Sequence, residues 1–355
     1  MLGIGVGIGV NKGNGIGVSI PANTVAPVIS GTQVVGQTLS CTTGTWTGTP
    51  TYAYQWKLNG SNIGGATSST YVLQQTDAGS TNTIICVVTA TNSAGSVSAN
   101  SNTLTGITDA DAQAFFDATG VTDSTQKAAV NTLTIGLKSN SLWTSCYAIY
   151  PMVGGTATTH KFNLKDPRDL DAAFRLSFAG GWTHSSNGAL PNGTTGYANT
   201  FLTPLTSMNK DDSHYSYYSR TNVNAAQTEL GVILSSIENG LSLYTNNLYP
   251  NFKGAAGSYV SVAVADTIGC WLANRKSTTN SQGWRNGTKL LDTAQTSGVA
   301  NGSVYLAADH NNISQTQYST KQCAFASMGL GFSDANALIF SNLIIDFQTT
   351  LGRNV

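Results

Sequence analysis

Two carboxylates on either side of a glycosidic bond are the side chains that would let this chain cleave a sugar polymer. Canonical glycoside hydrolysis uses such a pair about 5–9.5 Å apart. The 355 residues contain only two glutamates, Glu229 and Glu238. Their spacing of nine is odd, so one uninterrupted strand would send them to opposite faces. The acidic run at residues 166–171 is rich in turn formers and is typical of a solvated loop. The sequence therefore predicts no catalytic residues and a protein that is not an enzyme.

Metal and nucleotide chemistry are also weakly supported. The four histidines are scattered, and the five cysteines lack zinc-binding spacing. Asp309-His310-Asn311-Asn312 could ligate Ca²⁺ through oxygens, but an Asx-rich turn is the commoner meaning of such a run. No Gly-Lys-Ser/Thr loop is present. We therefore predict no metal site and no cofactor.

Aromatic side chains could instead bind a sugar without cleaving it. Trp182 follows two glycines and precedes His184, which predicts a loop with an exposed ring. Trp182 and His184 are therefore glycan-binding candidates. Tyr215, Tyr217 and Tyr218 form a second aromatic run, and we predict that they pack in the core of a sandwich.

The composition favours an all-β protein that works outside cells. Only 10% of residues are charged, and 17 basic side chains balance 17 acidic ones. A protein without net charge has no overall electrostatic field that would attract nucleic acid. No apolar run approaches the length of a membrane span. No export leader is recognisable at the start of the sequence. We therefore expect a particle component released by lysis, ahead of a secreted protein whose leader is missing.

Residues 1–24 form a Gly-rich segment that begins with an alternation of Gly and branched residues. An extended strand would place Ile4, Val6, Ile8 and Val10 on one face and bare backbone on the other. We predict an arm that attaches to another chain. A frayed terminus is the alternative.

Residues 25–105 show short alternating runs separated by turn signals, which predict an antiparallel sandwich. Asn59-Gly60 is a tight-turn signal. The order Cys41, Trp56, Cys86 resembles bacterial and phage immunoglobulin-like repeats, in which a Trp packs over a cysteine pair between two sheets. The resemblance implies a Cys41–Cys86 disulfide, or two reduced core thiols if the chain stays in a reducing cytoplasm.

Residues 106–142 change to a helical period, and residues 143–355 return to strands. Two capped helices are expected in the first of these segments, docked on the domain that follows. Asn-Gly pairs at Asn187, Asn192, Asn239, Asn286 and Asn301 are hairpin candidates. A final helix is expected from Ser333 to Leu351.

The last segment is similar to laminin-G and concanavalin-like jelly rolls. The similarity lies in residues 284–291, which resemble the family's Asn-Gly hairpin, and in residues 325–334, which resemble its last core strand and the turn into a helix. Residues 192–198 resemble a first strand with a ligand-facing edge, which makes Tyr197 a third glycan-binding candidate. The Glu-x-Asp-x-x-Glu strand of the family's glucanases is missing.

The predicted fold is mainly β: an immunoglobulin-like sandwich and a concanavalin-like jelly-roll sandwich joined by a short helical pair. This organisation resembles phage surface proteins such as head fibres, capsid decorations and tail adhesins. It implies a non-enzymatic structural protein on the virion surface, extracellular after lysis. We expect a homotrimer that binds capsid or tail proteins through its arm and contacts host-surface glycan. A secreted bacterial adhesin, a carbohydrate-binding module and a tail receptor-binding protein are the alternatives.

Overall fold

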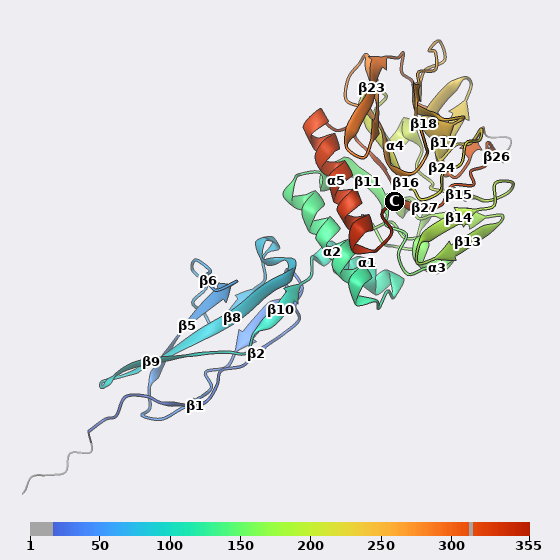
Figure 1. The fold of residues 1–355 in the computed structure, drawn as a ribbon. Helices are drawn as coiled ribbons and strands as arrows, with labels where there is room; N and C mark the ends of the chain where they lie inside the picture. Colours follow the sequence, from blue (N-terminus) through green and yellow to red (C-terminus); the bar gives the residue numbers. More distant parts are fainter. Residues whose placement is uncertain (1–16, 312–314) are drawn as a thin grey trace, which may run out of the picture. The chain divides into compact units, whose positions relative to one another are not determined.

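The computed structural model describes residues 17–311 and 315–355, and these residues fall into two compact units. The first unit ends at Ile107, and the second runs from Thr108 to Val355 and includes Ala78–Ser80. Both are built mainly from antiparallel strands (Figure 1). The predicted mainly β class is therefore confirmed. The arm residues Ile4, Val6, Ile8 and Val10 lie outside the described residues.

The first unit is a small two-sheet sandwich. Sheet β2-β3-β7 faces sheet β10-β8-β5-β6, β9 pairs with β8, and β1 pairs with β4. The bounds are β1 Asn23–Val25, β2 Ile29–Ser30, β3 Thr38–Cys41, β4 Thr45–Trp46, β5 Thr51–Leu58, β6 Ser61–Asn62, β7 Thr70–Val72, β8 Gly79–Asn92, β9 Gly95–Asn100 and β10 Leu104–Ile107. As predicted, Asn59 and Gly60 make the two-residue turn between β5 and β6, both with positive φ.

The core of the first unit contains the three residues that carried the immunoglobulin-like resemblance. Trp56 on β5 is fully buried and lies beside Cys86 on β8. Cys41 on β3 belongs to the other sheet, and its thiol hydrogen-bonds that of Cys86. Both cysteines are free thiols in this structure. The predicted disulfide would therefore join the two sheets of this unit.

Oxidation of this pair is expected to raise the free energy of unfolding of the first unit. The bridge would close a long loop and stabilise by ~4 kcal/mol in the chain-entropy model. The measurement is the melting temperature of the first unit with and without reductant, together with thiol titration. Cys41→Ser is the control, because it should remove the dependence on reductant. Unchanged thiol content after oxidation would contradict the prediction.

The second unit is a larger sandwich with helices on one side. Its eight-stranded sheet has the order β13-β14-β27-β16-β21-β22-β23, with β11 paired to β27, and its seven-stranded sheet has the order β12-β15-β24-β17-β18-β19-β20. The strands are β11 Cys146–Tyr150, β12 Ser177–Ala179, β13 Trp182–Ser185, β14 Gly188–Pro191, β15 Tyr197–Asn199, β16 Ser213–Ser219, β17 Leu230–Leu234, β18 Ile237–Tyr244, β19 Asn247–Lys253, β20 Val262–Ala263, β21 Gly269–Arg275, β22 Asn280–Arg285, β23 Thr288–Ala294, β24 Tyr305–Leu306 and β27 Cys323–Gly329. A separate hairpin pairs β25 Asp309–His310 with β26 Gln315–Thr316.

The helices of the second unit form at capped boundaries. They are α1 Ala110–Thr119, α2 Ser124–Ser139, α3 Ala157–His160, α4 Pro204–Ser207 and α5 Asp334–Thr350. Asp109 and Asp123 cap α1 and α2, and Ser333 caps α5. Gly120 ends α1 in the left-handed conformation that glycine adopts without strain. Helices α1, α2 and α5 share one core with a face of the eight-stranded sheet (Figure 1).

Strand β16 lies in the middle of the eight-stranded sheet, and all seven of its residues are buried. Tyr215 and Tyr217 face the core between the two sheets, whereas Tyr218 faces the helices. This confirms the core placement predicted for the tyrosine run. The seven-stranded sheet also has an outer face, which points away from the core between the sheets, and the candidate site lies on that face.

Three of the five Asn-Gly pairs predicted as hairpin candidates do not form hairpin turns. Asn192 and Asn301 lie between consecutive strands that do not pair with each other. Asn239-Gly240 does not form a hairpin turn, because both residues lie inside β18.

Glu229 and Glu238 do not lie on one strand. Glu229 precedes β17, Glu238 lies in β18, and Ser235-Ser236 makes the turn between these strands with two positive φ values.

Candidate functional site

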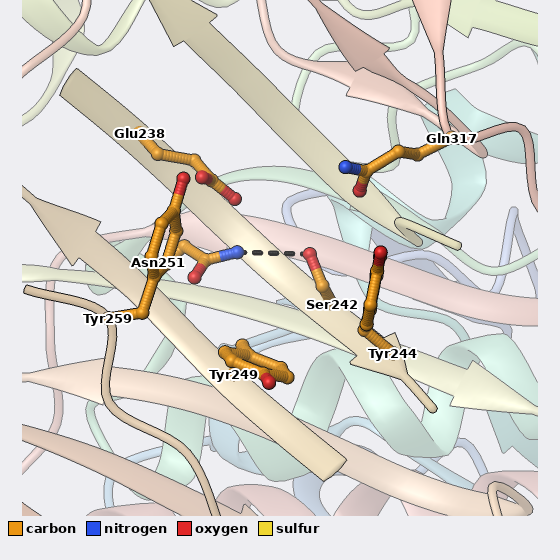
Figure 2. A pocket seen from close by; sticks show the side chains of 7 residues that line it. All are labelled: Glu238, Ser242, Tyr244, Tyr249, Asn251, Tyr259 and Gln317. Carbon is orange, nitrogen blue, oxygen red and sulfur yellow. Dashed lines mark hydrogen bonds between the residues drawn. The ribbon is translucent and has the colours of Figure 1, made fainter. Parts of the chain in front are cut away.

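A cavity of about 240 Å³ opens on the outer face of the seven-stranded sheet. Figure 2 shows its lining, which comes from β18, β19, the β19–β20 connection and the segment after β26. We call it the tyrosine cavity, and its lining residues are Glu238, Ser242, Tyr244, Tyr249, Asn251, Tyr259 and Gln317.

Strand alternation explains why these side chains point outward. On β18, Leu241 and Leu243 are fully buried in the core between the sheets, so Ser242 and Tyr244 face the other way. The register pairs Ser242 with Tyr249 on β19. The polar and aromatic residues of the two strands therefore form neighbouring rows on one surface.

Three tyrosine rings make the walls of the cavity. The ring of Tyr249 is perpendicular to that of Tyr244, at 6.1 Å and 82°. It is also perpendicular to that of Tyr259, at 6.4 Å and 84°. Edge-to-face contacts of this kind hold rings in fixed orientations. The ring of Tyr259 remains 51% exposed and can lose further surface when a ligand binds.

The floor of the cavity is a hydrogen-bonded polar network. The Asn251 side chain donates to the Ser242 hydroxyl at 2.9 Å. Thr228 lies 3.1 Å from the same hydroxyl, donates to Asp309 at 3.0 Å, and lies 2.9 Å from Gln317 Oε1. Buried polar groups that are satisfied in this way keep one arrangement. The network therefore fixes the lining before any ligand arrives.

Glu238 provides the carboxylate in the wall. It is 5% exposed, and the Tyr259 hydroxyl donates a hydrogen bond to it. Burial raises the pKa of Glu238, while Tyr259 and the Lys253 charge act in the opposite direction. Lys253 is the cross-strand partner of Glu238, and its ammonium lies 5.1 Å from the Tyr259 ring centroid.

Asp309 lies behind the floor and is 2% exposed. Burial first, and then the neighbouring Glu238 charge, raise its pKa to about 8. Its Oδ1 has no hydrogen-bond partner among residues 17–311 and 315–355. A Cβ on Gly231 would meet that oxygen at 1.9 Å, so the carboxyl group occupies the space a side chain would need. Within these ranges no group of three or more His, Cys, Asp or Glu side chains could hold a metal ion.

The predicted glycan candidates lie elsewhere in the second unit. Trp182 is not in a loop: it begins β13 and is partly buried, and its indole nitrogen donates to the Ala179 and Tyr197 carbonyls at 3.0 and 3.2 Å. The expectation of an exposed, loop-borne ring is therefore wrong. His184 faces His160 across 3.0 Å between their Nδ1 atoms.

Tyr197 lies on the seven-stranded sheet but does not line the tyrosine cavity. Its ring stacks on Tyr305 at 5.1 Å, and Tyr305 stacks on His310 at 4.3 Å. No finding tests whether Trp182, His184 or Tyr197 binds a glycan, and each stays a prediction.

The sequence reading missed Tyr244, Tyr249 and Tyr259 as site residues. A signal was present, because Leu241 and Leu243 alternate with Gly240, Ser242 and Tyr244. The hairpin between β18 and β19 was hidden, because its turn residues Thr245 and Asn246 adopt positive φ without a glycine.

No helix among the described residues has the length and apolar character needed to cross a bilayer.

Comparisons with known proteins give weak similarities. No protein-family model matches the chain, and no curated protein matches it. Domain 4 of AbnA, a GH43 extracellular arabinanase from Geobacillus stearothermophilus solved with arabinotriose, has a TM-score of 0.32 at 11% identity, over 56% of this chain and 98% of that chain. A Trypanosoma rangeli sialidase mutant with trans-sialidase activity has a TM-score of 0.41 at 7% identity. The match covers 90% of this chain and 53% of the sialidase chain. The binding domain of Paraclostridial Mosquitocidal Protein 1 has a TM-score of 0.30 at 8% identity. The match covers 47% of this chain and 45% of that chain. At these scores the comparisons assign neither a family nor a ligand.

Proposed function

We propose that the second unit binds a carbohydrate in the tyrosine cavity and does not cleave it. The supporting observation is that three tyrosine rings and four hydrogen-bonding side chains converge on one cavity. A sugar presents apolar C–H faces that pack on aromatic rings, and hydroxyls that pair with carboxylate, amide and hydroxyl groups. Ligand sites generally combine aromatic walls with a few placed polar groups.

The carboxylates support binding rather than hydrolysis. Glu229 is fully buried and forms an ion pair with Lys321 at 3.0 Å, so it faces no ligand. Asp309 is also buried and is not part of the lining. Glu238 is thus the one carboxylate that the described residues contribute to the cavity wall. A canonical glycosidase needs a second carboxylate across the scissile bond.

A tyrosine nucleophile is the exception used by sialidases. Tyr259 hydrogen-bonds Glu238, which makes this alternative worth weighing. Burial, together with that hydrogen bond and the Glu238 charge, raises the pKa of Tyr259 above its usual value. The phenol therefore stays protonated at neutral pH and acts as a hydrogen-bond donor.

Glycan binding at this cavity predicts a selective loss when its most exposed ring is removed. Full-length protein is screened on a glycan array, and the best ligand is measured by calorimetry. Tyr259→Ala is expected to weaken binding about tenfold or more, equivalent to ~1.4 kcal/mol. Its melting temperature should change little because the ring is half exposed. Sugar released from the ligand is assayed in parallel, and none is expected.

Tyr197→Ala is the matched control, because Tyr197 lies on the same sheet outside the cavity. Its affinity should stay within about twofold of the parent. Loss of binding in Tyr197→Ala, with Tyr259→Ala unaffected, would move the site to the Tyr197 stack. Absence of any glycan ligand would refute the proposal.

The setting in which the unit would meet a glycan also remains a proposal. Display on a phage particle as a homotrimer is supported by the low charge and by the resemblance to phage surface proteins, not by the comparisons. The secreted adhesin or carbohydrate-binding module stays the alternative, and glycan binding is common to both.

A further inference from the structure

Two buried side chains outside the tyrosine cavity contact the ammonium of a buried lysine, Lys321. Lys321 and Glu229 are fully buried, and Gln227 is 6% exposed. The Lys321 ammonium lies 3.0 Å from Glu229 Oε1 and donates to Gln227 Oε1 at 3.0 Å and to the Leu243 carbonyl at 3.1 Å. An amine, a carboxylate and a carboxamide therefore meet in one water-poor place.

The fold brings these groups together from distant parts of the chain. Gln227 and Glu229 precede β17, and Lys321 lies two residues before β27. Thr320 also contacts Gln227, whose amide nitrogen donates to the Thr320 hydroxyl at 2.8 Å. The carboxamide is held at both ends, with its oxygen on the ammonium and its nitrogen on the hydroxyl.

An ion pair alone explains this arrangement poorly. Removing two charges from water costs several kcal/mol per ion, and apolar residues of similar size often serve stability as well. A chemical change that removes both charges would relieve that cost. The Gln227 carboxamide, which accepts a hydrogen bond from the Lys321 ammonium, is the group with which such a change can occur.

We propose that Lys321 Nζ and Gln227 Cδ join in an isopeptide bond, with Glu229 as the proton carrier. First, the ammonium gives one proton to Glu229. The neutral amine then forms an N–C bond to Gln227 Cδ, and the Cδ–Nε2 bond breaks to release ammonia. Of the five protons that begin on the two nitrogens, three leave with ammonia, one stays on the new amide and one stays on Glu229. No oxidant or other reactant is needed.

The groups around Lys321 favour both the proton transfer to Glu229 and the formation of the bond to Gln227 Cδ. Burial raises the pKa of Glu229, with the Lys321 charge acting in the opposite direction, so a protonated Glu229 is an acceptable product. The ammonium, which contacts Gln227 Oε1, polarises the carbonyl before it gives up its proton. The product contains a neutral amide and a neutral acid in place of two buried charges.

The test is the intact mass of the purified full-length protein under denaturing, reducing conditions. The expected mass is lower than that of the sequence by one ammonia molecule. A succinimide at an Asn-Gly pair loses the same mass, so a tryptic map is needed. Acylated Lys321 resists trypsin, and the map should join residues 221–253 to an uncleaved peptide 290–353. Full intact mass, with normal cleavage after Lys321, overturns the proposal.

Two variants separate the role of each group. Lys321→Arg keeps a cation but cannot form the bond, and Glu229→Gln removes the proton carrier. Both should show no peptide joined between these two segments. Cross-linked Glu229→Gln would reject Glu229 as the carrier. If neither variant folds, the wild-type mass and map still decide whether the bond exists.

Discussion

Replacing Tyr217 with alanine is expected to lower the free energy of unfolding of the second unit by ~3–5 kcal/mol. The Tyr217 ring is fully buried in the core between the two sheets. Its hydroxyl donates to the Lys321 carbonyl at 2.7 Å, which also ties β16 to the segment before β27. Truncation removes the ring contacts and leaves a cavity in the middle of the largest sheet. Denaturant unfolding of the second unit measures the loss.

Tyr217→Phe separates the ring from the hydroxyl. It keeps the packing, leaves the Lys321 carbonyl without this donor, and should cost ~1 kcal/mol. If Tyr217→Ala cost no more than Tyr217→Phe, the ring would not be part of a packed core.

Acidification is expected to destabilise the second unit through His214. The ring is fully buried, its Nδ1 donates to the Leu330 carbonyl at 2.6 Å, and its Nε2 lies 3.0 Å from Ser327 Oγ. Burial lowers the pKa of His214 to about 4, partly opposed by the Leu330 hydrogen bond. The folded state therefore disfavours the proton that the unfolded chain binds below about pH 6.5. Neutral His214 therefore contributes fully to the free energy of unfolding above about pH 6.5. As the pH falls toward 4, the free energy of unfolding decreases by about 3 kcal/mol.

His214→Asn isolates this contribution, because the Asn amide can still donate toward the Leu330 carbonyl. The quantity to compare is the change in unfolding free energy between pH 7 and pH 4 in each protein. The variant should lose about 3 kcal/mol less than the parent. Asp309, whose pKa burial raises to about 8, acts in the opposite direction in both proteins and cancels in the difference. Equal losses would contradict a buried, neutral His214.

Local chemical signals in the sequence predicted much of the fold. Asp109 and Gly120 mark the ends of α1, and Asn59-Gly60 marks a hairpin turn. These signals work because each residue satisfies a requirement of its own backbone. Tyr217 was placed in the core because its strand carries aromatic residues on both faces.

The candidate site could not be predicted in the same way. It depends on two hairpins whose turns, Ser235-Ser236 and Thr245-Asn246, adopt positive φ without glycine. Without those turns, the sequence did not show that β18 pairs with β17 and β19, and Tyr244 was not placed on one surface with Tyr249. Trp182 was misplaced because its neighbouring glycines suggested a loop, whereas β13 begins at the Trp itself. Tertiary pairing decided these positions.

The position of β27 has a consequence for the synthesis of the protein. This strand begins at Cys323 and pairs with β11, β14 and β16, although β11 already ends at Tyr150. At ribosomal speeds of about 5–20 residues per second, β11 waits on the order of ten seconds for its partner. Until then the nascent chain carries strand edges that could pair with other chains. The first unit has no such delay, because its strands end at Ile107. We therefore expect the yield of folded protein in a cell to depend on how well the unfinished second unit is shielded during translation.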